Sequence, residues 1–203
     1  MPTFYGLGQV YQLKPQTTSF TLGDIVDFGR GVRECIDYII SLPNRIVIMG
    51  NHDYWFLCWA EKGIILYDWR VQGGEATMKS YRNDIRHIPL EHINLLKNAL
   101  YFYIDKKNRL FLHGGYDIKK PVKDQDTYSL LWNRNLVEVA SNEVIPFYSH
   151  VFIGHTRTQV INSDVPVHLH NLTMCDTGAG RDGFLSIINV DTFEFWQSKR
   201  QIY

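Results

Sequence analysis

Four short apolar segments of this sequence each run into a glycine and a side chain that can bind a metal. The side chains are Asp24, Asn51, His113 and His155. In open α/β sheets, binding sites form at the carboxyl ends of the strands, so we expect these four residues to converge. A carboxylate, an amide oxygen and two imidazoles suit Mn, Fe or Zn better than an ion that prefers oxygen alone. The pattern therefore predicts a metal centre.

Such a centre favours phosphoester hydrolysis. A carboxylate such as Asp24 has two oxygens and can bridge two cations. Two cations roughly 3.5–4 Å apart clamp a phosphoester and generate a metal-bound hydroxide for in-line attack. His52, next to Asn51, is then placed to donate a proton to the leaving alkoxide. Asp27, one turn past Asp24, is the expected partner that holds the His52 tautomer.

Each of these residues also has a purely structural interpretation. An aspartate before a helix is usually an N-cap, and a lone histidine at a strand end is usually a hydrogen-bonded structural residue. Only the fourfold recurrence of the pattern favours a site. The remaining histidines lack this context, and we expect them to be surface or loop residues: His87, His92, His150, His168 and His170.

The elements that must position the site follow from the apolar periodicity. Strands are predicted over 4–8, 19–22, 45–49, 100–104, 109–112 and 151–153, and helices over 31–42 and 90–99. An irregular helical region is expected over 54–81, with a break at Gly73 and Gly74, and a run of antiparallel strands from Val167 onward. This order predicts an α/β sandwich with mixed sheets.

The composition is that of an ordinary globular domain. The chain has 203 residues, and we expect one domain over 1–203. Twenty-one basic residues balance 21 acidic ones, so no overall charge attracts nucleic acid or an anionic membrane. We expect Cys35, Cys58 and Cys175 to be buried, reduced thiols. No signal peptide and no apolar run of roughly 20 residues is present, which predicts a cytoplasmic location.

Four motifs, in order, resemble those of the calcineurin-like metallophosphoesterases: GDIVDFG (23–29), GNHD (50–53), HGG (113–115) and GHT (154–156). The chain looks most like the branch of Ser/Thr protein phosphatases and diadenosine tetraphosphatases. Trp69 followed by Gly73-Gly74, the run 131–134 and Asp176-Thr177-Gly178 support that branch.

The resemblance implies a four-layer α/β/β/α sandwich and two divalent metals, Mn or Fe/Zn. It implies that Asp24 bridges the metals, that Asn51, His113 and His155 are ligands, and that His52, oriented by Asp27, is the general acid. Arg134 matches a phosphate-binding arginine, a planar donor suited to phosphate, and Asn51 would also face the phosphate. The substrate would be a phosphoprotein or a dinucleoside polyphosphate. No nucleic acid or membrane partner is implied.

The sequence departs from this family in two places. Phe28 stands where the branch has arginine, and Arg30 is the nearest cation that could replace it. The family opens with Asp-x-His, whereas Gln9-Val10-Tyr11 stands here, which leaves one metal if the sequence is complete. Only ten residues, 9–18, separate the first two predicted strands, too few for the usual crossover helix. Either the first strand–helix unit is shortened, or the sequence omits part of the natural chain. The alternative function is a catalytically impaired, phosphatase-like binding or regulatory domain.

Overall fold

The computed structural model describes residues 16–29 and 31–200. The predicted first strand over 4–8, together with Gln9, Tyr11 and Arg30, lies outside the described residues. Within them, none of the helices is long and apolar enough to cross a membrane.

The site begins at a parallel pair of short strands, β1 (Ser19–Thr21) and β2 (Arg45–Val47). Helix α2 (Val32–Ser41) joins them and buries Val32, Ile36 and Ile39. The register pairs Phe20 with Ile46, so that both strands point their carboxyl ends at the same edge. This arrangement brings the loop after β1 and the loop after β2 together, as expected for consecutive parallel strands.

A second, five-stranded sheet has the order β3-β4-β5-β7-β6. Its strands are β3 (Phe102–Ile104), β4 (Arg109–Leu112), β5 (His150–Ile153), β6 (Val167–Leu169) and β7 (Leu172–Met174). The pairs β4–β5 and β5–β7 are parallel, and the two outer pairs are antiparallel. The antiparallel run predicted from Val167 onward is confirmed for the β6–β7 pair, but the sequence did not indicate that β7 also pairs in parallel with β5. A hairpin of β8 (Ser186–Ile188) and β9 (Phe195–Gln197) follows.

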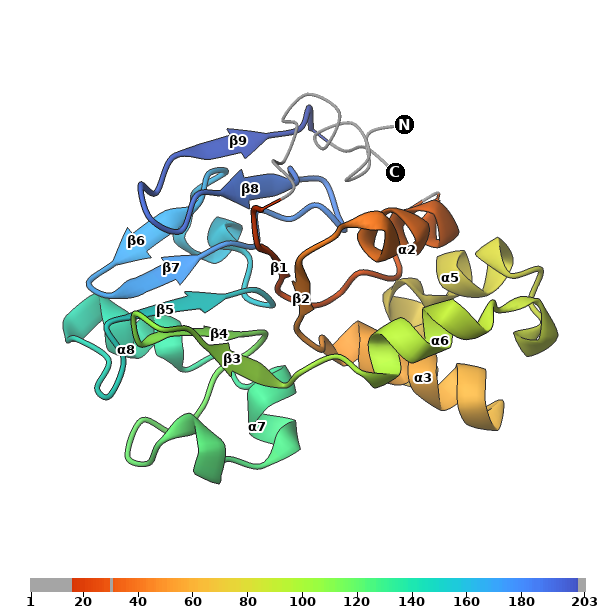
Figure 1. Ribbon diagram of the computed structural model, residues 1–203, viewed down its shortest axis with the longest axis horizontal. Helices are drawn as coiled ribbons and strands as arrows, with labels where there is room; N and C mark the ends of the chain where they lie inside the picture. Colours follow the sequence, from red (N-terminus) through yellow and green to blue (C-terminus); the bar gives the residue numbers. More distant parts are fainter. Residues whose placement is uncertain (1–15, 30, 201–203) are drawn as a thin grey trace.

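The layers are those of an α/β sandwich, as the sequence predicted (Figure 1). Aromatic rings fill the space between the sheets: Phe20 of β1 stacks on Phe111 of β4 at 4.1 Å between ring centroids, and Phe111 stacks on Phe152 at 4.9 Å. Helices α7 (Thr127–Trp132) and α8 (Leu136–Asn142) share an apolar cluster with the opposite face of the five-stranded sheet. The other large cluster lies under α2, α3 and α6.

The irregular helical region is broken more often than predicted. Its helices are α3 (Asn51–Lys62), α4 (Tyr67–Trp69), a π-helical turn over Arg70–Gly74, and α5 (Glu75–Ser80). Gly63, at φ 67°, ends α3, and Gly73, at φ 108°, interrupts the later turn, because only glycine adopts such φ values without strain. Helix α6 (Leu90–Lys97) follows a 3₁₀ turn over Ile85–His87. Two further 3₁₀ turns cover Val122–Asp124 and Thr158–Ile161.

The burial of two histidines and of the cysteines differs from expectation. His92 is fully buried, between the Tyr81 hydroxyl and the Asp37 carboxylate, each 2.7 Å from a ring nitrogen, so it is a core residue of α6. His150 starts β5, half-buried, and its Nε2 lies 2.6 Å from the Thr173 hydroxyl. The three cysteines form no disulfide, as expected, but each keeps part of its surface exposed.

Candidate active site

Two glycines allow the loops after β1 and β2 to meet. A Cβ on Gly23 would lie 2.6 Å from the Gly50 backbone and from the His113 ring, and a Cβ on Gly50 would collide with Asp24. Asp24, Asp27 and His155 all have positive φ, at 54°, 73° and 56°. Non-glycine residues in this conformation cost about 1–3 kcal/mol each and concentrate at functional sites. The local backbone is therefore strained where the candidate residues lie.

Asp53 ties the two loops together. This fully buried carboxylate accepts hydrogen bonds from the backbone N–H groups of Asp24 (2.8 Å), Ile25 (2.9 Å) and Gly50 (2.9 Å). Burial, followed by the charge of Asp24, raises the pKa of Asp53 to about 7, and the bond from the Gly50 N–H opposes that rise. Asp53 thus fixes both the start of α3 and the position of Asp24.

Replacing Asp53 with alanine is expected to lower the free energy of unfolding by about 3 kcal/mol, because several buried N–H groups would lose their acceptor at ~1–3 kcal/mol each. Urea denaturation measures the change. Asp182→Ala, which removes an exposed carboxylate, is the control, with an expected change under about 0.5 kcal/mol. Equal midpoints and slopes for the two variants would show that Asp53 does not hold the loops.

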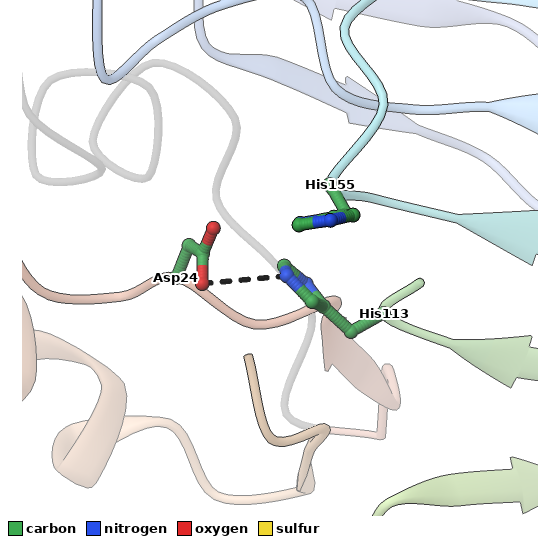
Figure 2. Close-up of side chains that lie close together, drawn as sticks. All are labelled: Asp24, His113 and His155. Carbon is green, nitrogen blue, oxygen red and sulfur yellow. Dashed lines mark ion pairs between the residues drawn. The ribbon is translucent and has the colours of Figure 1, made fainter. Parts of the chain in front are cut away.

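The predicted metal ligands lie together at the carboxyl ends of β1, β2, β4 and β5. Asp24, His113 and His155 each offer a ligand atom, and these atoms lie within 4.8 Å of one another (Figure 2). Nε2 of His113 lies 3.4 Å from Oδ1 of Asp24 and 3.0 Å from Oδ1 of Asn51. Nδ1 of His113 donates to the Leu22 carbonyl at 2.6 Å, which leaves Nε2 as the ligand nitrogen. The donor set therefore fits a divalent transition metal.

The charges of the cluster also favour a cation. Burial acts to raise the pKa of Asp24, but the nearby His113, His52 and His155, with the His52 backbone N–H at 3.1 Å, hold that pKa below its usual value. Burial, then the charges of His113 and Arg134, lowers the pKa of His155 to about 3. A carboxylate that stays ionised and an imidazole that stays neutral are the protonation states a metal requires.

His52 and Asp27 form the second group of the site. Both are buried, and Nδ1 of His52 lies 2.5 Å from Oδ2 of Asp27. Trp69 Nε1 donates to the same oxygen at 2.8 Å, and the Thr77 hydroxyl donates to Oδ1 at 2.5 Å. Burial acts to lower the pKa of His52, but the bond to Asp27 and the charge of Asp24 outweigh it and raise that pKa. His52 is therefore held in one orientation and kept readily protonated.

Arginine side chains border the cluster on one side. Arg134, just after α7, donates from Nη1 to the His155 carbonyl at 2.6 Å. Burial lowers the pKa of Arg134, and the charges of Asp176 and Asp24 oppose this effect. The charges of Arg157 and Arg181 lower that pKa further, so both guanidinium groups lie within electrostatic reach of Arg134. The Arg181 guanidinium carbon lies 4.9 Å from the centroid of the Phe28 ring. A cation thus lies over the ring of Phe28, the residue that stands where the resembling branch has arginine.

The donor cluster, the His52–Asp27 pair and the arginines line one cavity of about 1870 Å³. Its lining includes Asp24, Asn51, His113 and His155 together with Asp27 and His52, and the arginines Arg134, Arg157 and Arg181. A cavity of this size exceeds the roughly 300–1,000 Å³ of most small-molecule sites.

Sequence reasoning missed several contributors to the site. Asp53 stands inside the GNHD motif and Trp69 before the Gly73-Gly74 pair, so local signals existed for both. Arg157 directly follows the GHT motif, whereas Thr77 and Arg181 lie outside the four motifs. Thr77 reaches Asp27 because α5 packs against α2. Thr77 and Asp27 are 50 residues apart in the sequence, and no local pattern indicates their contact.

Comparison with known proteins defines the class. The model of the calcineurin-like phosphoesterase family matches residues 3–172, so the chain belongs to that family. Among curated proteins, it is 26% identical over 145 residues to the uncharacterized protein MJ0912 of Methanocaldococcus jannaschii. That match covers 71% of this chain and 53% of the relative, so the chain spans about half the relative's length.

Solved structures share the fold. A putative diadenosine tetraphosphatase has a TM-score of 0.72 at 15% identity, with 97% of this chain and 86% of the other covered. A Saccharomyces cerevisiae protein serine/threonine phosphatase with similarity to human phosphatase PP5 has a TM-score of 0.59 at 15% identity, with 98% and 77% covered. A metallophosphoesterase from Sphaerobacter thermophilus has a TM-score of 0.54 at 16% identity, with 91% and 78% covered.

Proposed function

We propose that this chain is a metal-dependent phosphoester hydrolase that acts on a phosphomonoester or a phosphoanhydride. The observation that carries the proposal is one cavity in which a buried, Asp27-bonded His52 lies beside the donor cluster of Asp24, His113 and His155. The family match supports phosphoesterase chemistry. The arginines of the same cavity supply the positive charge that a phosphate needs.

Asp24, Asn51, His113 and His155 would hold the divalent ion. When bound, the ion polarises a phosphoryl oxygen and lowers the pKa of water, which allows attack near neutral pH. His113 is fixed for this task by its bond to the Leu22 carbonyl. Asp24 is fixed by the loop that Asp53 anchors. The family resemblance implies a second ion, whose Asp-x-His ligands have no counterpart at Gln9-Val10-Tyr11.

The remaining residues of the chain handle the proton and the phosphate. His52 presents Nε2 to the substrate, because Asp27 takes Nδ1, and donates a proton to the leaving oxygen. Trp69 and Thr77 keep Asp27 in place. Arg134 would bind the phosphate oxygens; its position is fixed by the bond to the His155 carbonyl. Arg181, whose guanidinium group lies over the Phe28 ring, would supply a further cation for the phosphate, and the role of Arg30 stays a prediction because Arg30 lies outside the described residues.

A metal-dependence assay tests the proposal. The purified chain, loaded with Mn²⁺, should release phosphate or p-nitrophenol from p-nitrophenyl phosphate, diadenosine tetraphosphate or a phosphoserine peptide, and EDTA should abolish the release. Metal bound at the site with no turnover of any of the three substrates would overturn the proposal. That result would favour the phosphatase-like binding domain instead.

A further inference from the structure

Two stacked aromatic side chains form an exposed surface at the edge of the cavity. Tyr128 and Trp132 lie one helical turn apart on α7, with ring centroids 5.1 Å apart and ring planes 19° from parallel. We call this pair the aromatic platform. Both residues line the cavity, yet Tyr128 is 70% exposed. A large aromatic ring that is stacked on one side and open to solvent on the other can receive a further flat ring.

The rest of the structure holds the platform in place. The Asp126 side chain caps α7 by accepting from the Ser129 N–H at 2.8 Å, and the apolar face of the helix, Leu130 and Leu131, is buried. Tyr54 of α3 packs edge-on against Trp132 at 6.0 Å. A fixed platform binds a ligand without losing side-chain entropy, so its rings are suited to recognition.

The platform is continuous with the candidate active site. Trp55 connects them, since its ring lies 5.0 Å from His52 and 6.1 Å from Trp132. Trp132 lines the same cavity as His155. Arg134 follows two residues later, and Arg157 and Arg181 line the same cavity. A flat apolar surface and three guanidinium groups therefore line the same cavity as the donor cluster and His52.

We infer that the aromatic platform binds the base of a nucleoside polyphosphate or dinucleoside polyphosphate, whose phosphate chain extends past His52 toward the arginines. This inference rests on the proposed function and specifies its substrate class. A nucleotide combines a planar base with several adjacent negative charges, which matches a stacking surface next to three cations. A phosphoserine peptide offers one phosphate and no obligatory ring. Hydrolysis adds water to one phosphorus and breaks a P–O–P bond, and the departing phosphate receives the proton from His52.

Substrate preference in Mn²⁺-loaded protein tests this inference. The ratio of kcat/KM for diadenosine tetraphosphate to kcat/KM for tripolyphosphate, which lacks a base, should fall about 5- to 150-fold in Tyr128→Ala, the change that corresponds to ~1–3 kcal/mol of stacking. Tyr128→Trp should retain the ratio. The control is Tyr67→Ala, which removes a tyrosine that is 77% exposed and lies outside the cavity lining, and it should leave the ratio unchanged.

A binding measurement separates this inference from the proposed function. Titration calorimetry with the β,γ-imido analogue of ATP and with imidodiphosphate, which lacks the base, needs no turnover. We expect the ATP analogue to bind about 5- to 150-fold more tightly than imidodiphosphate. Tyr128→Ala should remove most of this difference in affinity. If no substrate is hydrolysed but this pattern holds, the proposed function fails and the base site stands. Equal affinities, or a kcat/KM for a phosphoserine peptide above that for diadenosine tetraphosphate, would overturn the inference.

Discussion

Replacing His52 with alanine is expected to lower kcat by roughly 10²–10⁴-fold on a substrate with a poor leaving group, such as an alkyl phosphate. The structure suits His52 to proton donation, because its Nδ1 is bonded to Asp27 and this bond helps to raise its pKa. A protonated Nε2 facing the cavity can supply a proton to a leaving alkoxide. Without it, the alkoxide must depart as an anion.

The leaving group distinguishes proton donation from a structural role. p-Nitrophenolate is a weak base and needs little help, so His52→Ala should lose less activity on p-nitrophenyl phosphate than on the alkyl ester. Metal content should stay the same, because His52 is not among the donor cluster. Asp27→Asn should show the same substrate dependence with a smaller loss, since the asparagine fills the space but holds the imidazole less well. His87→Ala, at an exposed histidine, is the control. Equal losses on both substrates, or loss of metal, would contradict the assigned role.

Replacing His113 with alanine is expected to remove bound metal and to lower kcat/KM by at least about 10³-fold. Nε2 of His113 lies within 3.4 Å of both the Asp24 carboxylate and the Asn51 amide oxygen, so it is central to the cluster. A divalent ion contributes several kcal/mol to the transition state, and about 1.4 kcal/mol corresponds to a tenfold change in rate. Loss of His113, the central ligand of the ion, should therefore lower kcat/KM more than loss of Arg134 or Arg181.

Metal analysis of the dialysed protein provides the measurement. A purified chain with this 203-residue sequence should retain one tightly bound equivalent of Mn, Fe or Zn, because the described residues supply one cluster of donors and Gln9 and Tyr11 cannot replace a carboxylate and an imidazole. His113→Ala should retain far less, whereas His168→Ala, at an exposed histidine of β6, should match the unaltered chain. Two equivalents in the unaltered chain would contradict the prediction of a single centre. Full occupancy in His113→Ala would exclude His113 as a ligand.

Much of the fold was predictable because it depends on local patterns. The continuous apolar run that contains β2, the helical spacing of α2 and the glycine-flanked ends of β4 and β5 gave elements close to those observed. The parallel pairing of β7 with β5 was not predictable, since a short strand after a turn can join either neighbour and only the whole sheet decides which. His92 was misjudged because a single polar residue on a helix gives no sign that a tyrosine and an aspartate from other segments will satisfy it.

By itself, the sequence determined which chemical groups this protein can use and where the backbone turns to present them. Asp24, Asn51, His113 and His155 each follow a strand, and glycines such as Gly23 and Gly50 permit the close loop approach. Only the tertiary structure decided how these groups are supported. Asp53 bridges two loops, Thr77 fixes Asp27, and Arg181 stands over Phe28. These contacts join segments 28 to 153 residues apart, and such pairings follow from the packing of whole layers rather than from any local pattern.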